Sequence, residues 1–217
     1  MRSLGILEAG SGPLRVLALG AHADDIEIGC GGTLLRLAAE NRELEVRWVV
    51  LCSTPERAAE ARASAAAFLQ AGTPNRIVVG AHRDGFLPYD GAVVKDEFEA
   101  LKRDFQPDVV LTPFREDRHQ DHRKVSELTW NTWRDHLILE YEIPKYDGDF
   151  GSPNVFAPLP AALLERKIEL IVKAFPSQAS KAWFSPELFR SVARIRGMEC
   201  NAPEHYAEAF YCRKVVF

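Results

Sequence analysis

The stretch Leu17-Ala18-Leu19-Gly20-Ala21-His22-Ala23-Asp24-Asp25 decides how this chain is interpreted, and it continues as Ile26-Glu27-Ile28-Gly29-Cys30-Gly31-Gly32-Thr33. Residues 14–19 form a short apolar run that ends in glycine, which predicts a buried strand. An imidazole and two carboxylates follow directly. Adjacent carboxylates are costly to bury unless a cation pairs with them. We therefore interpret His22, Asp24 and Asp25 as half of a metal site. The alternative is a solvated Asp-Asp pair that caps a helix.

Composition restricts the class of protein. The chain has 217 residues with 47% hydrophobic and 27% charged, which is ordinary for a globular protein. A formal net charge of -4 argues against a dedicated nucleic-acid binder, because no basic surplus is available to neutralise phosphates. The four cysteines are scattered without a CxxC pair, so we expect reduced thiols. The first residues lack a signal-peptide core, and no apolar run reaches about 18 residues. These features predict a cytoplasmic protein without a membrane span.

Strand-like and helix-like segments alternate as far as residue 141. Short apolar runs predict strands at 14–19, 46–52, 76–79, 108–112 and 137–141. Between them, a glycine turn at 29–32 leads into a predicted helix at 33–41, and further helices are predicted at 55–71 (ended by Gly72), 95–105 and 121–136. This alternation predicts an α/β fold, namely a Rossmann-like, doubly wound and mostly parallel sheet with helices on both faces.

The pattern changes after residue 141. Residues 142–154 form a turn-rich connection, followed by predicted helices at 161–175 and 187–196, with Gly197 as the stop signal. Residues 206–217 are predicted to form a closing strand. With no linker or repeat, we expect one domain over residues 1–217, with a C-terminal extension of the sheet domain.

The first glycine cluster does not favour a nicotinamide-binding protein. Gly29-Cys30-Gly31-Gly32 departs from the GxGxxG pattern. The second predicted strand ends in Leu51-Cys52-Ser53, where a dinucleotide-binding fold has an acidic residue.

A second group of metal-ligating residue types follows the fourth predicted strand. His119 and His122 are three residues apart, so one helical turn would place both on the same face. Asp121 lies between them in the sequence. It is placed to orient either imidazole by a hydrogen bond to the ring nitrogen that does not bind the metal. In a doubly wound sheet, the first and fourth strands are neighbours at the topological switch point, where ligands bind. The sequence therefore predicts that His22 meets His119 and His122.

Two imidazoles and one carboxylate suit a catalytic Zn²⁺, which takes three protein ligands and a water molecule. We expect His22, Asp25 and His122 to be the ligands, and Asp24 to be the general base that takes a proton from the zinc-bound water. His119 would stabilise the oxyanion or protonate the leaving amine. The same ligand set also binds Fe²⁺, and another divalent ion is possible.

These residues resemble the motifs of the PIG-L (LmbE-like) family of zinc-dependent de-N-acetylases. The first family motif, Ala-His-Pro-Asp-Asp with a following Gly-Cys-Gly-Gly-Thr, matches residues 21–25 and 29–33, and the second, His-x-Asp-His, matches residues 119–122. Weaker matches at 57–60, 83–85, 177–178, 196–197 and 206–210 extend the resemblance over nearly the whole chain. The family proline is Ala23 here, from which we expect a less rigid loop but no lost ligand.

The resemblance implies removal of the acetyl group from a small-molecule N-acetylated amino sugar, such as an N-acetylglucosamine derivative, or its conjugate. It also implies the ligand set and base given above, and substrate contacts from Arg57 and Asp84. For these two residues, a helix-surface ion pair and a turn cap are the structural alternatives. Assembly into a homo-oligomer stays open.

Two other functions remain. A phosphoesterase would need a second metal, for which Glu116 and Asp117 are candidate bridging ligands. A non-catalytic sugar-binding module would have little use for an uncoordinated Asp24.

Overall fold

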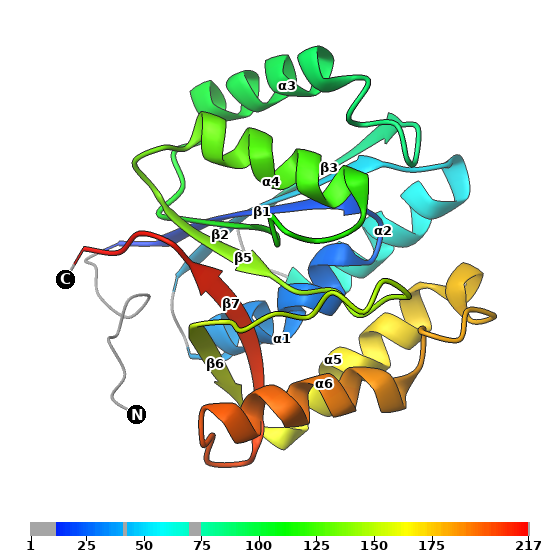
Figure 1. Cartoon of the computed structure of the whole chain (residues 1–217), viewed down its shortest axis with the longest axis vertical. Helices are drawn as coiled ribbons and strands as arrows, with labels where there is room; N and C mark the ends of the chain where they lie inside the picture. Colours follow the sequence, from blue (N-terminus) through cyan, green and yellow to red (C-terminus); the bar gives the residue numbers. More distant parts are fainter. Residues whose placement is uncertain (1–11, 41–42, 70–74, 217) are drawn as a thin grey trace.

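A twisted sheet lies at the centre of the fold, with helices on both faces (Figure 1). The computed structural model describes residues 12–40, 43–69 and 75–216. Within these residues the strands are β1 (Leu14–His22), β2 (Leu44–Cys52), β3 (Asn75–His82), β4 (Val109–Pro113), β5 (Leu137–Tyr141), β6 (Val155–Leu159) and β7 (Tyr206–Cys212). The helices are α1 (Asp25–Ala39), α2 (Pro55–Leu69), α3 (Gly91–Asp104), α4 (Gln120–Thr132), α5 (Ala161–Ala174) and α6 (Pro186–Glu199), with a 3₁₀ turn, η1 (Pro176–Gln178).

The strand order is β3-β2-β1-β4-β5-β7-β6. β1 pairs in parallel with both β2 and β4, whereas β7 runs antiparallel to β5 and to β6. The chain thus adds strands on one side of β1 and then crosses to the other side, so the switch point lies between β1 and β4. This confirms the predicted mostly parallel, doubly wound sheet and the neighbouring positions of its first and fourth strands.

Two apolar cores form because side chains alternate along the strands. Val16 and Ala18 of β1 belong to the core that α1, α2, α5 and α6 cover, whereas Leu17 and Leu19 belong to the core under α3 and α4. Trp133 is fully buried in the second core and Trp130 packs at its margin. The sheet is therefore buried on both faces, and its polar site must lie at an end of the strands.

The glycine cluster lies inside α1, so the predicted turn at 29–32 was wrong. The helix begins at Asp25, immediately after the strand and its two-residue connection. The glycines are needed for close packing. A Cβ at Gly29 would lie 2.1 Å from the ring of Tyr141, and one at Gly31 would lie 2.6 Å from Phe68. The cluster therefore lets α1 approach its neighbours, and Asp25 gains the N-terminal position of the helix.

Gly197 does not end its helix, because α6 continues to Glu199. Other predicted boundaries also differ from the structure. α3 begins at Gly91 and not at residue 95, and α4 ends at Thr132 and not at 136. β6 was not predicted, and the closing strand ends at Cys212. Asn41 and Gly72, predicted near helix ends, lie outside the described residues.

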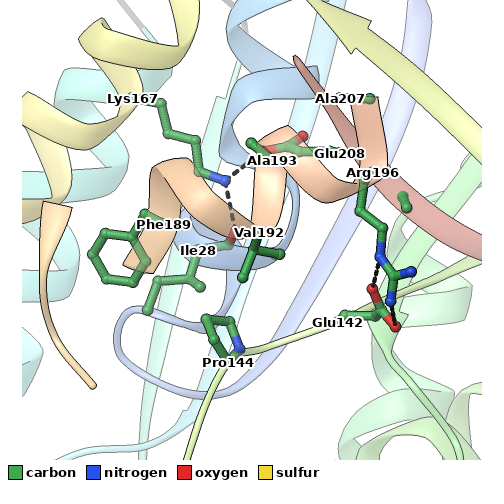
Figure 2. Close-up of a pocket in the computed structure, with 12 residues that line it drawn as sticks. Ile28, Glu142, Pro144, Lys167, Phe189, Val192, Ala193, Arg196, Ala207 and Glu208 are labelled. Atoms are coloured by element: carbon green, nitrogen blue, oxygen red, sulfur yellow. Dashed lines mark hydrogen bonds and ion pairs between the residues drawn. The ribbon is translucent and has the colours of Figure 1, made fainter. Parts of the chain in front are cut away.

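Two buried ion pairs tie the C-terminal elements to the sheet. Lys167 of α5 donates to Glu208 of β7 over 2.6 Å, and Arg196 of α6 donates to Glu142 over 2.8 and 2.9 Å. Between them lies a cavity of about 30 Å³ (Figure 2). This volume admits a water molecule but not a sugar.

Two further observations concern the described residues. None of the helices there is long and apolar enough to cross a membrane. Their four cysteines are free, and three of them are buried.

Candidate metal centre

The first half of the site is formed where β1 passes into α1. His22 is the last residue of β1, and Asp25 is the first residue of α1. Asp25 Oδ2 accepts a hydrogen bond from the backbone N–H of His22 over 2.8 Å, so the two residues hold each other. Asp24 between them has φ 107°, in the left-handed region that costs a non-glycine residue free energy. This strained connection places both aspartates at the carboxyl end of β1.

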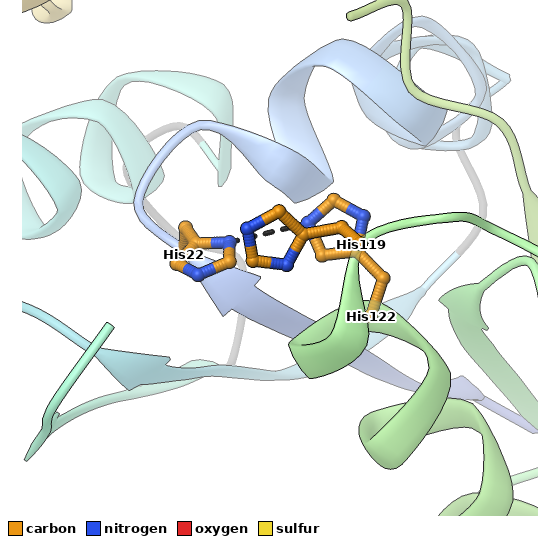
Figure 3. Close-up of side chains that lie close together, drawn as sticks. All are labelled: His22, His119 and His122. Carbon is orange, nitrogen blue, oxygen red and sulfur yellow. Dashed lines mark hydrogen bonds between the residues drawn. The ribbon is translucent and has the colours of Figure 1, made fainter. Parts of the chain in front are cut away.

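The second half of the site comes from the start of α4. The side chain of His119 caps this helix by accepting from the backbone N–H of Asp121. His122 lies one turn further along, and its ring approaches His22 (Figure 3). His22 Nδ1 and His122 Nε2 are 3.1 Å apart, although the residues are separated by 100 positions in the chain. The neighbouring strands β1 and β4 thus bring the two predicted histidine segments together.

One nitrogen from each of two imidazoles and both oxygens of one carboxylate come together at this point. His22 Nδ1 lies 3.7 Å from Asp25 Oδ2, and His122 Nε2 lies 3.4 Å from Asp25 Oδ1. Donors bound tetrahedrally to one zinc ion at 2.0–2.1 Å are roughly 3.3 Å apart. The donor types and their separations resemble those around one divalent ion, and the ligand set of His22, Asp25 and His122 stays a prediction.

His119 belongs to the same group of imidazoles. Ring nitrogens of His22, His119 and His122 all lie within 4.8 Å of one another. The His119 ring centroid is 4.7 Å from that of His22 and 4.8 Å from that of His122. His119 is half-exposed, so it combines proximity to these donor atoms with access from solvent.

The charges of these groups are complementary. Burial alone would lower the pKa of His22, but the carboxylates of Asp121, Asp84 and Asp25 outweigh it and raise the pKa to about 10. Burial would also lower the pKa of His122, but the carboxylates of Asp25 and Asp117 outweigh it and raise the pKa to about 9. A divalent cation that binds there must take the place of any proton on the ring nitrogens that face it.

Each of the two converging imidazoles is held by a carboxylate on its other nitrogen. Asp121 Oδ2 lies 3.1 Å from His22 Nε2, and Asp117 Oδ2 lies 2.9 Å from His122 Nδ1. Such outer carboxylates fix the ring orientation and the tautomer of metal-binding histidines. Asp121 thus contacts His22, and its role in orienting the imidazole stays a prediction. Asp117, predicted only as a candidate bridging ligand, lies on the opposite side of the His122 ring from Asp25.

Asp24 is buried beside these donors and bonded to Arg57. Its Oδ2 accepts from Arg57 Nη2 over 2.9 Å. Burial raises the pKa of Asp24 to about 6 against the field of the Arg57 guanidinium. The group is therefore ionised at neutral pH but close enough to titration to accept a proton.

Arg57 has more inward contacts than the sequence indicated. Its guanidinium also donates to the carbonyl of Ala23, to Glu60 over 2.7 Å and to Ser177 over 3.1 Å. An ion pair, the structural alternative for Arg57, is thus present with Glu60, although it is partly buried. The predicted substrate contact of Arg57 remains a prediction. Asp84 has a side chain that is 77% exposed, and its Oδ1 lies 3.0 Å from His22 Nε2.

A second group of metal-binding residue types shares His22. Donor atoms of His22, Cys52 and Asp121 also lie within 4.8 Å of one another. Cys52 Sγ is 3.9 Å from Asp121 Oδ2. Burial raises the pKa of the Cys52 thiol, with Asp121 adding to the effect, so the thiol stays protonated.

The chain belongs to the PIG-L family. The family model described as GlcNAc-PI de-N-acetylase matches residues 17–133, which include both histidine segments of the site. The family recognised from the two motifs is thereby confirmed.

Solved structures with the same fold have diverse descriptions. The conserved protein TT1542 from Thermus thermophilus is 23% identical, with a TM-score of 0.73 over 94% of this chain and 96% of that one. N,N'-diacetylchitobiose deacetylase from Pyrococcus horikoshii is 21% identical, with a TM-score of 0.70 over 97% and 89%. GalB, the 4-carboxy-2-hydroxymuconate hydratase from Pseudomonas putida, is 16% identical, with a TM-score of 0.69 over 94% and 98%. At these identities the likeness establishes the fold, so the reaction has to be inferred from the site.

Proposed function

We propose that this protein is a zinc-dependent hydrolase that removes the acetyl group from an N-acetylated amino sugar or its conjugate. The observation that carries the proposal is the convergence of His22 and His122 on Asp25, with the buried Asp24 preceding Asp25 in the chain. The PIG-L family and the similar diacetylchitobiose deacetylase support the substrate class.

His22, Asp25 and His122 would hold the ion. Zn²⁺ suits two imidazoles and one carboxylate, and Fe²⁺ accepts the same donors. A divalent ion bound there would polarise the acetyl carbonyl and make water more acidic. The buried Asp121 and Asp117 keep both imidazoles in place for this purpose.

Asp24 would act as the general base. Its carboxylate takes a proton from the attacking water, whose oxygen adds to the acetyl carbonyl carbon. A base whose pKa lies near the working pH is effective because it is ionised and can still hold a proton. The pKa of Asp24 is about 6, raised by burial and opposed by Arg57, which suits this role.

His119 would stabilise the tetrahedral intermediate. The carbon–nitrogen bond then breaks, acetate leaves and the sugar amine takes up a proton, for which His119 is the candidate donor. Burial and the neighbouring His122 and His22 lower the pKa of His119, which favours the neutral ring and therefore stabilisation of the intermediate over proton donation. Arg57 and Asp84 are the proposed contacts to substrate hydroxyl or phosphate groups.

A phosphoesterase with two bridged ions finds less support. Asp117, one of the candidate bridging ligands, is 2% exposed, and both of its oxygens are already bonded to His122 Nδ1, to the backbone N–H of His119 and to Lys145. Glu116 is exposed.

Acetate release tests the proposal. Purified protein is incubated with N-acetylglucosamine, N,N'-diacetylchitobiose and N-acetylglucosaminyl conjugates, with and without a chelator. We expect chelator-sensitive release of acetate, which Asp24→Asn lowers by about 10²–10⁴-fold while bound zinc is retained. Asp135→Asn, which changes an exposed aspartate, is the control and should act like the unaltered protein. Full activity in Asp24→Asn would refute the base, and release of acetate from none of these substrates would refute the function.

A further inference from the structure

Asp117 joins the metal centre to a segment that the motifs do not include. This carboxylate is 2% exposed and has a donor for each oxygen. Oδ1 accepts from the backbone N–H of His119 over 2.7 Å. Oδ2 accepts from His122 Nδ1 over 2.9 Å and from Lys145 Nζ over 2.8 Å. One carboxylate oxygen is thus shared by a candidate metal ligand and a lysine.

Lys145 comes from the turn-rich connection between β5 and β6. Its ammonium group lies 2.8 and 2.7 Å from the two oxygens of Asp149, in the same connection. Asp149 Oδ2 also accepts from the backbone N–H of Arg118, over 2.7 Å, in the segment before His119. The side chains of Lys145, Asp117 and Asp149 are 11%, 2% and 7% exposed. The connection is therefore fastened to the histidine segment by buried charges.

Lys145 is the only described ammonium group bonded to these two carboxylates. Without it, Asp117 and Asp149 would face each other as two buried negative charges. Like charges at this separation repel strongly when they are out of water. Either carboxylate could relieve the repulsion by rotating, and rotation of Asp117 would release the His122 ring.

We propose that Lys145 is a positioning residue of the metal centre, which holds Asp117 against His122 and thereby fixes the ring for metal binding. This inference rests on the proposed role of His122 as a ligand. Within the described part of the chain, the Lys145 ammonium group bonds to Asp117, Asp149 and the carbonyl of Ile143. It therefore acts through Asp117 and not on the substrate.

The affinity for Zn²⁺ tests this role without any substrate. The protein is freed of metal by a chelator, and its Zn²⁺ dissociation constant is measured by competition with a chromophoric chelator. Changing an outer partner of a metal-binding histidine weakens metal binding by about 10–100-fold. We expect Asp117→Asn to fall in this range and Lys145→Met to lie near its lower end, at about tenfold. Lys145→Arg, which keeps the charge, should restore most of the affinity.

A double-mutant cycle separates positioning from a general loss of structure. If Lys145 acts through Asp117, the variant with both Lys145→Met and Asp117→Asn should bind Zn²⁺ about as weakly as Asp117→Asn alone. The proposal would be overturned if the loss of Zn²⁺ affinity in the double variant equalled the product of the losses in the two single variants. Unaltered affinity in Lys145→Met would overturn it as well.

Lys167→Met is the matched control. It removes a similarly buried lysine, whose ion pair with Glu208 lies between α5 and β7 and does not include His122. We expect a lower melting temperature but unaltered Zn²⁺ affinity. Should Lys145→Met not fold, Lys145→Gln gives the same test, because it keeps a polar side chain but removes the positive charge opposite Asp117, and it should weaken Zn²⁺ binding several-fold. Unaltered affinity there would equally contradict the proposal. Since none of these assays uses a sugar, failure of the deacetylase function leaves their result intact.

Discussion

Two clusters of buried charge differ in how completely their groups are paired. In the C-terminal cluster, Glu208 accepts from Lys167, from Thr33 and from the backbone N–H of Gly32, and Arg196 pairs with Glu142. In the β1–β4 cluster, one ring nitrogen of His22 and one of His122 face the carboxylate of Asp25. Three further aspartates of this cluster are buried, namely Asp24, Asp117 and Asp121. The first cluster is complete within the chain. The second has an excess of carboxylate that a divalent cation would balance.

Loss of the His22 or His122 imidazole has the largest expected effect, because it should remove most of the bound zinc. No change in the C-terminal cluster should do so. His22→Ala or His122→Ala removes one of three proposed ligands, so we expect bound zinc to fall from about one per chain to a small fraction. Elemental analysis of the purified variants measures this. His136→Ala, which removes a histidine paired with Asp135 away from the site, is the control and should keep its zinc. Stoichiometric zinc in both site variants would contradict the ligand set.

Loss of a charge in the C-terminal cluster should lower the stability of the protein and leave zinc binding unaltered. Breaking a buried ion pair by removing one partner costs about 3–5 kcal/mol. We expect Lys167→Met to lie at the lower end, because Glu208 keeps the hydrogen bonds from Gly32 and Thr33. Urea unfolding measures the free energy, and zinc content and acetate release should stay unaltered in the folded protein. A loss of zinc in this variant would mean that the two clusters are coupled.

The smallest expected effect is a shift of the pH profile on removal of Arg57, a residue of α2 that contacts the β1–β4 cluster. Asp24 must be ionised to act as a base, so activity falls as the pH drops through its pKa of about 6. Arg57 lowers that pKa, and its removal should raise it by about one unit or more. In Arg57→Met the acidic limb of kcat/KM should therefore move to higher pH.

Arg62→Met is the control for this shift, since Arg62 lies on the same helix and donates to backbone carbonyls there and in β3. A raised KM with an unmoved acidic limb would instead assign Arg57 to substrate binding, as the family resemblance implies.

The sequence predicted the parts of the site that follow strand ends. His22 and the pair His119 and His122 lie in the segments that follow two apolar runs, and parallel strands bring such ends to one edge of a sheet. The neighbouring positions of the first and fourth strands were expected from the same alternation. Asp121 was found because it lies between the two histidines.

Other features depend on contacts between distant segments, which local patterns do not record. Gly29 looked like part of a turn, but its lack of a side chain serves helix packing against Tyr141. β6 contains Pro158, which disfavours a strand, yet an edge strand tolerates it. Lys145 stands in a turn-rich connection with no motif, so only the fold reveals its contact with Asp117.

The position of the bound ion tests the central claim most directly. Crystals of the protein grown with Zn²⁺ can be examined by anomalous diffraction at the zinc absorption edge. We predict one strong peak per chain, about 2.0–2.2 Å from His22 Nδ1, His122 Nε2 and a carboxylate oxygen of Asp25. A peak that lacks any of these three ligands, or no peak at this site, would contradict the account.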